Sequence, residues 1–287
     1  MESGIMKIVS TIAECRAQRK AFTGAGPVVF VPTMGALHEG HGSLVQMART
    51  LAGLEGFVIS SVFVNPLQFG PQEDFSHYPR PLENDVKMLE QWHTDLLFAP
   101  PPEQMYPEGK VEVAVDPGPL GDVLEGALRP GHFRGVCTVV AKFLSIVQPD
   151  VLILGQKDYQ QQIILRRMAA DLNFSTQVLT APIVRESGGL AASSRNQYLT
   201  SDERARAGAI YAALTWAAEE IRTGHNFVRP LIRGIQRRIS AAGMKVEYVV
   251  ACHTQTLTAY EKIIDGPCVL LAAAKLSTTR LIDNVIV

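Results

Sequence analysis

Residues 28–41 read VVFVPTMGALHEGH. The apolar, β-branched run 28–33 ends just before Gly35, which predicts a buried strand followed by a tight turn. Residues 41–52 then repeat apolar side chains on one helical face, at Leu44, Val45, Ala48 and Leu51. The stretch therefore predicts a strand, a glycine-containing loop and a helix.

The same alternation continues along the next 130 residues. Short apolar runs predict strands at 57–64, 96–99, 151–154 and 176–184, the last interrupted by Pro182. Amphipathic segments between them predict helices at 81–92, 135–147 and 158–172. This order is typical of the α/β class, with a parallel sheet that is covered by helices on both faces.

The pattern changes near residue 185, where a polar loop extends to residue 199. Thr200 and Glu203 have the spacing of a capping box and predict a helix from Thr200 to about residue 222. A second helix is expected at 227–242, and strands are expected at 245–252, 268–274 and 280–287. We therefore expect two domains, 1–184 and a smaller α+β domain at 185–287.

Composition excludes several classes of protein. The 287 residues include 27 basic and 28 acidic side chains, which gives a net charge of −1. The chain therefore lacks the excess of basic residues that is typical of proteins that bind a long nucleic acid. The four cysteines form no CxxC pattern and are expected to be reduced, buried thiols. Lys7 and Glu14 interrupt the N-terminal apolar residues, which argues against a signal peptide. No apolar run is long enough to span a bilayer, and we expect a cytoplasmic protein without a membrane partner.

The first chemical motif is PTMGALHEGH at 32–41. Ligands of open parallel sheets bind beyond the carboxyl ends of strands, and the amides at a helix start attract phosphate. Gly35 and Gly40 would let the backbone approach a ligand closely. His38 and His41 add ring N–H donors that can follow charge developing on phosphate oxygens during nucleotidyl transfer. Two solvated histidines are the alternative, and zinc is disfavoured because no further ligand stands at the right spacing.

A second motif, GQKDYQQ at 155–161, again follows a strand and opens a helix. Lys157 is suited to phosphate, and Asp158 could accept from a ribose hydroxyl or hold hydrated magnesium. Gln161 lies one turn further on and can point toward the same ligand. The alternative is a helix cap with a surface lysine.

Three further segments carry polar side chains in loops. Ser193, Ser194 and Arg195 are suitable phosphate partners, although a solvated loop is an equal alternative. Asn65 and Gln68 are neutral groups among apolar neighbours, which suits a small polar substrate or a buried turn. Arg129 could serve a phosphate or a carboxylate. Neither a GxSxG motif nor a GxxxxGK[ST] phosphate loop is present.

Taken in order, these segments resemble the pantothenate synthetase family over nearly the whole chain. The stretches that carry the resemblance are VPTMGALHEGH, FVNPLQFGPQEDFSHYPRPLEND, RPGHFRGV, QPDVLILGQKDYQQQ, SSRNQYL and TTRLIDNVIV. The resemblance implies a Rossmann-like doubly wound sheet with a smaller C-terminal lid domain. It also implies ATP-dependent condensation of (R)-pantoate with β-alanine through pantoyl adenylate, with AMP and pyrophosphate as products. Magnesium accompanies ATP in this family, and a homodimer is expected.

The resemblance also assigns residues. It implies catalytic roles for His38, His41, Lys157 and Arg195, with His41 as proton donor; we favour both histidines chiefly as phosphate donors. Gln68 and Gln161 would bind pantoate, with Gln68 also near β-alanine, and Asn65 joins them from its position. The sequence identifies no protein ligand for magnesium. The residues implied in ATP binding are Met34, Gly35, Ala36, Leu37, His38, Glu39, Gly40, His41, Gly155, Gln156, Lys157, Asp158, Val184, Ala192, Ser193, Ser194 and Arg195.

The chain departs from the family pattern at three positions. Gln156 stands where the family usually has Glu, Ala192 where it has Met, and Gly42 where it has Leu. Two other functions remain as alternatives. An enzyme that transfers AMP to a phosphate acceptor is disfavoured by the uncharged Asn65 and Gln68. A nucleotide-binding regulator without catalysis is disfavoured by the presence of both histidines, and an aminoacyl-tRNA synthetase by the modest length and balanced charge.

Overall fold

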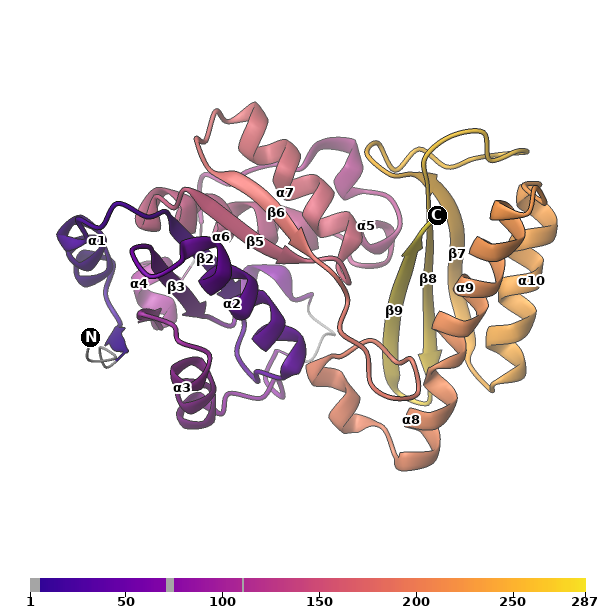
Figure 1. Cartoon of the computed structure of the whole chain (residues 1–287), viewed down its shortest axis with the longest axis horizontal. Coiled ribbons are helices and arrows are strands. Elements are labelled where there is room, and N and C mark those ends of the chain that lie inside the picture. Colours follow the sequence, from indigo (N-terminus) through magenta and orange to yellow (C-terminus); the bar gives the residue numbers. More distant parts are fainter. Residues whose placement is uncertain (1–5, 71–74, 110) are drawn as a thin grey trace. The chain divides into compact units, whose positions relative to one another are not determined.

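The computed structural model describes residues 6–70, 75–109 and 111–287. The chain divides into two compact units, coloured along the sequence in Figure 1. The first unit comprises Met1–Gly155 and Gln160–Ala181, and the second comprises Gln156–Tyr159 and Pro182–Val287. Residues 156–159 thus belong to the second unit, although the chain on either side of them belongs to the first. No sequence pattern predicts this division.

The first unit contains a six-stranded sheet in which every neighbouring pair is parallel. Its spatial order is β1-β4-β3-β2-β5-β6, so the chain reverses direction across the sheet between the neighbours β2 and β5. This reversal is the place where open α/β sheets bind ligands. The strands are β1 (Lys7–Val9), β2 (Val28–Thr33), β3 (Phe57–Val62), β4 (Leu96–Phe98), β5 (Val151–Gly155) and β6 (Gln177–Ala181).

Helices cover both faces of this sheet, as the unbroken apolar strands require. Val29 and Val31 of β2 pack with α2 (Glu39–Ala52) and α3 (Leu82–Gln91). Val28 and Phe30 point the other way, toward α1 (Ile12–Ala21), α6 (His132–Val147) and α7 (Tyr159–Asp171). The alternation of side chains along a strand thus divides one run of apolar residues between two cores.

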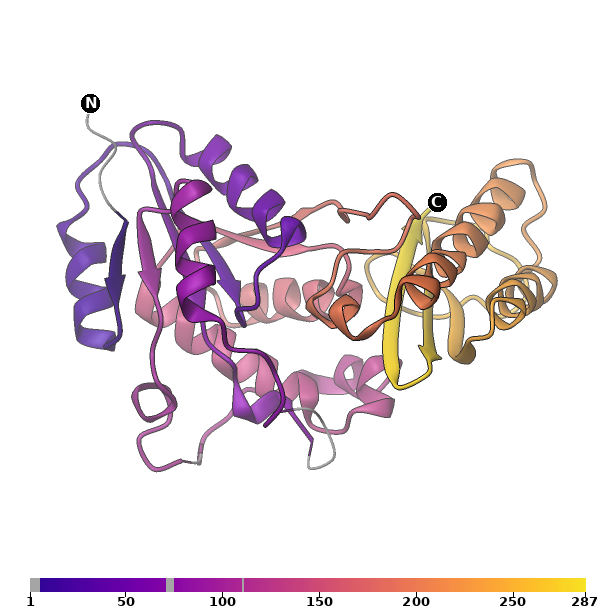
Figure 2. The ribbon, with the colours of Figure 1, turned by 90° about the horizontal axis from the view of Figure 1, so that it is seen from below.

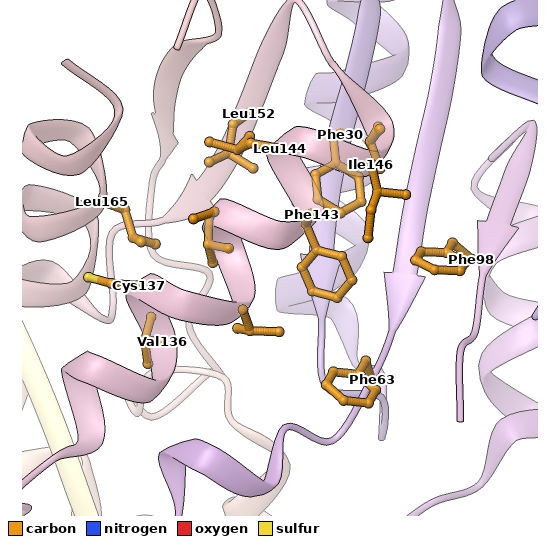
Figure 3. Close-up of a cluster of buried hydrophobic side chains, with 14 of the residues drawn as sticks. Phe30, Phe63, Phe98, Val136, Cys137, Phe143, Leu144, Ile146, Leu152 and Leu165 are labelled. Carbon is orange, nitrogen blue, oxygen red and sulfur yellow. The ribbon is translucent and has the colours of Figure 1, made fainter. Parts of the chain in front are cut away.

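An aromatic cluster packs against the part of the sheet formed by β2, β3 and β4. In Figure 3 the Phe143 ring of α6 lies among Phe30, Phe63 and Phe98. Its centroid is 5.6, 6.2 and 6.2 Å from theirs, at steep interplanar angles that favour edge-to-face contact. The cluster packs α6 against β2, β4 and the residue that follows β3.

The second unit contains the antiparallel sheet β7-β8-β9, formed by Lys245–His253, Cys268–Leu276 and Thr279–Ile286. Helices α9 (Ala209–Arg222) and α10 (Val228–Ala241) lie on one side of it, as Figures 1 and 2 both show. Alternate β8 residues, from Cys268 to Leu276, pack in the core shared with these helices. The α+β arrangement expected for the C-terminal region is confirmed.

The helix predicted from Thr200 to residue 222 is divided. The Thr200–Glu203 capping box starts α8 (Ser201–Ala207), and α9 follows after Gly208. A Cβ at Gly208 would lie 2.0 Å from the Gly188 carbonyl oxygen, so this close approach requires glycine. Several short helices were also not anticipated: α4 (Pro102–Met105), α5 (Glu125–Leu128), and the 3-10 helices η1 (Pro66–Gln68), η2 (Gly118–Gly121) and η3 (Ser194–Tyr198).

The four cysteines are free and buried. Burial raises the pKa of Cys15 and Cys252 to about 11 and that of Cys137 and Cys268 to about 12. Across the described residues, every helix is too short or too polar to cross a bilayer. The predicted α/β class, with a parallel sheet and a smaller C-terminal α+β part, is confirmed.

Candidate active site

The loop between β2 and α2 has an unusual backbone that is held by one buried carboxylate. Gly35 and Ala36 have φ angles of 80° and 50°, so two successive residues adopt the left-handed conformation, which is costly for alanine. The fully buried Asp85 of α3 accepts hydrogen bonds from the N–H groups of Ala36 and Leu37, at 3.0 and 2.8 Å. Asp85 therefore holds the loop in this conformation through its two hydrogen bonds to the backbone.

His38 and His41, the two histidines of the first motif, lie at the start of α2, where their Nδ1 atoms cap the helix. The Gly40 N–H donates to His38 Nδ1 at 3.1 Å, and the His38 N–H donates to His41 Nδ1 at 3.3 Å. In the neutral rings the proton is therefore on Nε2 of each histidine. The ring centroids are 4.1 Å apart, so the structure brings together two Nε2–H donors.

The backbone amides of this loop are in use, which differs from the sequence interpretation. We expected the amides to attract phosphate, but those of Ala36 and Leu37 donate to Asp85 and those of His38 and Gly40 donate to imidazole nitrogens. The side chains, rather than these four N–H groups, are the donors that the loop can offer to a ligand.

Burial and hydrogen bonding oppose each other at Asp85. Burial raises the pKa of this carboxyl, and the Leu37 and Ala36 N–H groups lower it without cancelling the effect of burial. A Cβ on Gly35 would lie 2.8 Å from Asp85 Oδ2, so glycine is needed here for space as well as for its φ angle. No sequence pattern pointed to Asp85, because its partners are 48 and 49 residues away.

Gly42 also has a local explanation. A Cβ at this position would lie 2.8 Å from two atoms of the Trp92 ring. Trp92 at the end of α3 therefore occupies the space that the larger residue usual in the family would need.

Asn65 and Gln68 are brought together in and before η1, and both are buried. Asn65 Nδ2 donates to Gln68 Oε1 at 3.0 Å and to the Gly135 carbonyl at 3.1 Å. Its Oδ1 accepts from the Tyr106 hydroxyl at 2.8 Å. Asn65 thus uses both donors internally and holds Gln68 rather than presenting a free amide.

The amide nitrogen of Gln68 is turned toward the histidine loop. Gln68 Nε2 donates to the thioether sulfur of Met34 at 2.9 Å. Because sulfur is a weak acceptor, a ligand oxygen can replace it at small cost. Gln68 is therefore a donor that lies beside the Met34–His41 segment and is easily redirected.

Arg129 and His132 meet at the main chain of Gln68. His132 Nδ1 lies 2.8 Å from the Gln68 carbonyl oxygen, which can only accept, so Nδ1 carries the proton in the neutral ring. Arg129 donates to the same carbonyl at 3.3 Å and lies 3.1 Å from His132 Nε2. His132 was not anticipated as part of the site, although it stands in the quoted RPGHFRG segment.

The three glutamines that open α7 have different environments. Gln160 donates to the Leu120 and Val123 carbonyls, and Gln162 accepts from Thr180 and Arg166. The side chain of the half-buried Gln161, which the resemblance assigned to pantoate, makes no hydrogen bond within the described residues. The outer two glutamines are structural, and the amide of the middle one is not engaged by the rest of the described chain.

In the second unit, the Gln156–Asp158 segment is bound to β9. Asn284 donates through Nδ2 to the Gln156 and Lys157 carbonyls at 3.0 and 3.1 Å and accepts from Gln156 Nε2 at 3.0 Å. Lys157 Nζ lies 3.5 Å from Asp158 Oδ2. Gln156, one of the departures from the family pattern, is thus a donor to Asn284.

Val184 and the Ala192–Arg195 segment are brought together by a small hairpin. Arg185 and Ala191 form an antiparallel bridge, and the Ala192 N–H donates to the Val184 carbonyl at 2.9 Å. Ser193 caps η3 by accepting from the Arg195 N–H at 3.3 Å. The hairpin therefore places Val184 and Ala192, which are eight positions apart in the sequence, next to each other.

The proposed site residues are divided between the two units. The first unit contains Met34–His41, Asn65, Gln68 and Gln161, and the second contains Gln156–Asp158, Val184 and Ala192–Arg195. Gly155, which joins these two parts of the chain, ends β5. Within the described residues, no group of three or more His, Cys, Asp or Glu side chains could hold a metal ion. Residues 71–74 of the quoted FVNPLQFGPQED stretch lie outside the described residues.

Comparison with known proteins identifies relatives over the full length. The pantothenate synthetase of Acidothermus cellulolyticus is 47% identical over 283 residues, which cover 96% of this chain and 90% of the relative. That of Mycolicibacterium smegmatis is 45% identical, covering 99% of this chain and 88% of the relative.

Two solved structures are also similar to this chain over nearly its full length. The crystal structure of pantothenate synthetase from Thermus thermophilus matches with a TM-score of 0.89 and 45% identity, covering 98% of this chain and 99% of that one. The pantoate–β-alanine ligase of Francisella tularensis, complexed with β-γ ATP and β-alanine, matches with a TM-score of 0.80 and 33% identity, over 98% and 97% of the two chains. A family model described as pantoate–β-alanine ligase matches residues 7–286, and this chain belongs to that ligase family.

Proposed function

We propose that this chain condenses (R)-pantoate with β-alanine in two steps. In the first, a pantoate carboxylate oxygen attacks the α-phosphorus of ATP, which forms pantoyl adenylate and releases pyrophosphate. In the second, the β-alanine amine attacks the acyl carbon, the bond to AMP breaks, and the amine loses a proton as the amide forms. The observation that carries the proposal is the pair of Nε2–H donors on His38 and His41 after β2.

The histidine pair serves the first step. Charge increases on the phosphate oxygens as pyrophosphate leaves, and fixed donors stabilise it without reorganising. Protonation of Nδ1 would break the helix-capping bonds, which supports neutral rings that donate through Nε2. We therefore favour both histidines as phosphate donors over a role for His41 as a general acid.

Gln68 and Gln161 serve the acid substrate. Gln68 has an amide nitrogen that is bonded only to a weak acceptor, and Gln161 keeps its amide unused among the described residues. Both can donate to the carboxylate or hydroxyl oxygens of pantoate. Asn65 is a positioning residue here, since its donors hold Gln68 and the start of α6.

The second unit supplies the remaining nucleotide contacts in this proposal. Lys157 and Arg195 bring positive charge, and Ser193 and Ser194 bring hydroxyl groups. Val184, Ala192 and the backbone of Gln156–Asp158 complete this set. Gly155, Glu39 and Gly40 belong to the ATP contacts through the resemblance alone.

Magnesium would reach the enzyme with ATP. Mg²⁺ is usually held by substrate phosphates, waters and one or two carboxylates, and the half-exposed Asp158 is a suitable carboxylate. Bound there, the ion would neutralise charge on the departing pyrophosphate. The chain's own contribution is to align the carboxylate with the α-phosphate and to exclude competing nucleophiles.

ATP–pyrophosphate exchange tests the first step. Exchange that requires pantoate and proceeds without β-alanine is expected, and added β-alanine should convert the intermediate to pantothenate. Exchange that needs no acid, or a product in which AMP is joined to a phosphate acceptor, would favour the adenylyl-transfer alternative. ATP binding without any exchange would favour a regulator.

We also propose that the chain forms a homodimer and acts in the cytoplasm. Free, buried thiols suit a reducing compartment, and the family resemblance supports the dimer. Light scattering should give twice the 31.3 kDa mass of one chain, and fractionation should place the enzyme with cytoplasmic markers. A monomeric mass at micromolar concentration would contradict the dimer.

A further inference from the structure

We propose that Asp283 and Asn284, adjacent residues of β9, are positioning residues that hold both nucleotide-binding segments of the second unit. This inference rests on the proposed function for the identity of the ligand. Neither residue carried a role in the sequence interpretation, and both are buried. They lie on opposite faces of one strand, because successive side chains of a strand alternate.

Asn284 holds the Gln156–Asp158 segment by hydrogen bonds that also determine which amide atom of Asn284 is the nitrogen and which is the oxygen. Its Nδ2 contacts two carbonyl oxygens, those of Gln156 and Lys157, and only a nitrogen can donate to both. Its Oδ1 must then accept, and it does so from Gln156 Nε2. Three hydrogen bonds thus connect one side chain to two successive residues of the segment.

These bonds also set the direction of the segment's N–H groups. In a trans peptide the C=O and the following N–H point in opposite directions. Because the Gln156 and Lys157 carbonyls point toward Asn284, the N–H groups of Lys157 and Asp158 point away from β9. Asn284 therefore determines which way two successive donors face in a segment that we assign to ATP.

Asp283 acts on the other face, toward the hairpin at 184–192. Its carboxylate accepts two hydrogen bonds from Arg185, at 2.6 and 2.9 Å. The guanidinium lies 3.6 Å from the centroid of the Tyr211 ring and also donates to the Gly189 carbonyl at 3.0 Å. Arg185 is thereby fixed between β9 and α9.

The position of Arg185 also determines the positions of neighbouring hairpin residues that we assign to ATP. Arg185 pairs with Ala191, and the neighbouring Val184 accepts from the Ala192 N–H. Fixing Arg185 therefore sets the position of both Val184 and Ala192. Burying an ion pair costs desolvation free energy that an apolar pair would avoid, so packing alone does not account for this choice of residues.

Asn284→Asp tests the inference with almost no change in shape. The carboxylate cannot donate to the Gln156 and Lys157 carbonyls and would repel them. We expect the dissociation constant of magnesium–ATP, measured by calorimetric titration without pantoate, to rise about tenfold or more, since a lost buried hydrogen bond typically has an effect of this size. Pantoate affinity, which depends on the first unit, should change by less than about twofold.

Asn226→Asp is the matched control. Asn226 is also in the second unit and also donates through Nδ2 to a backbone carbonyl, that of Ile264, at 3.0 Å. It should lower the melting temperature without a change in ATP affinity. An equal loss of ATP affinity in the Asn226 variant, or unchanged affinity in Asn284→Asp, would overturn the inference.

Asp283→Asn gives a second, independent variant in case Asn284→Asp folds poorly. It should weaken ATP binding several-fold, whereas Glu247→Gln, which alters the half-buried Arg280–Glu247 pair on the same sheet, should not. Hydrogen–deuterium exchange adds a readout that needs no catalysis. ATP should slow exchange at 157–158 in the wild type and should protect these N–H groups less in Asn284→Asp, and equal protection in the two proteins would count against the inference.

The two proposals fail in different ways. Wild-type protein that binds ATP but gives no pantoate-dependent exchange would remove the proposed reaction, while the affinity and hydrogen-exchange tests would still decide the role of β9. Normal exchange with no effect of either β9 variant on ATP would remove only the role of Asp283 and Asn284.

Discussion

Two short loops follow the neighbouring strands β2 and β5, and they are held in opposite ways. The loop at 34–38 is held by a buried carboxylate, Asp85, which accepts from backbone N–H groups. The segment at 156–158 is held by a buried amide, Asn284, which donates to backbone carbonyls. One anchor takes up the donors of its loop, and the other takes up the acceptors.

The difference determines what each loop can offer an anion. When the N–H groups are occupied, the first loop must act through side chains, and it presents the two imidazoles. When the carbonyls are occupied, the second segment has N–H groups that point outward beside a lysine. We infer that a loop binds phosphate through its side chains when its anchor occupies the backbone N–H groups. A loop whose anchor occupies the backbone carbonyls can bind phosphate through its N–H groups.

The largest effect is expected at the imidazoles. His41→Ala should slow pantoate-dependent ATP–pyrophosphate exchange by roughly 10²–10³, the usual effect of removing one such donor. His225→Ala, at an exposed histidine paired with Glu220, is the control and should leave exchange unchanged. A His41→Ala rate within about a factor of two of wild type would mean that the first loop does not act through its side chains.

The anchor of the first loop should come next. Asp85→Asn leaves one of the two loop N–H groups without an acceptor and should lower the free energy of unfolding by about 1–3 kcal/mol, measured by urea denaturation. Exchange should fall about tenfold as Ala36 leaves its left-handed conformation. Adding Ala36→Gly should recover much of the activity, because glycine adopts this conformation without strain.

Rescue by Ala36→Gly should be confined to this loop. The same substitution combined with Asn284→Asp should bring no recovery, since that anchor holds a different segment. Equal recovery in both backgrounds would show that Ala36→Gly acts generally and that Asp85 does not maintain the strained turn.

A smaller effect separates the two anchors by pH. Burial raises the pKa of Asp85 above its ordinary 3.8, so the folded state binds this proton more tightly than the unfolded state. The contribution of Asp85 to stability is then complete below the ordinary pKa and is lost as the pH rises through the folded value. The unfolding free energy of wild type minus that of Asp85→Asn should therefore be larger near pH 4 than near pH 7.

An amide anchor should show no such trend. Wild type minus Asn284→Ala should be independent of pH over the same range, because the amide does not titrate. A parallel slope for both differences would mean that Asp85 is not the group that titrates.

The smallest effect is expected at Gln156. Gln156→Glu removes the donor to Asn284 Oδ1 but leaves the two bonds from Asn284 Nδ2 to the backbone. ATP affinity should weaken only about two- to fivefold, in line with one partly exposed hydrogen bond. A tenfold or larger loss would show that Gln156 contacts the nucleotide itself.

The sequence was sufficient for elements whose signals are local. Residues 28–33 form the predicted strand, and the Thr200–Glu203 capping box starts a helix as expected. Thr11 and Glu14 form a capping box of the same kind at the start of α1. The three residues of β1 are too few to show a pattern.

Sequence motifs could propose site residues only where those residues lie close together in the chain. The anchors Asp85 and Asn284 are far along the chain from the loops they hold, and Gln156 and Asn284 are 128 positions apart. Their roles depend on tertiary packing, which no spacing rule contains. For the same reason the amides of the first loop were expected to be available, although a distant carboxylate occupies them.

The buried cysteines make a further kind of experiment practical. Thiol reagents react with the thiolate, and four protonated, inaccessible thiols should stay silent toward maleimide at neutral pH. A cysteine introduced at Leu54 in the first unit and another at Phe227 in the second, both at exposed positions, would therefore take up a dye pair without removal of the native residues. Energy transfer between the dyes would then report, in real time, whether ATP changes the separation of the two units.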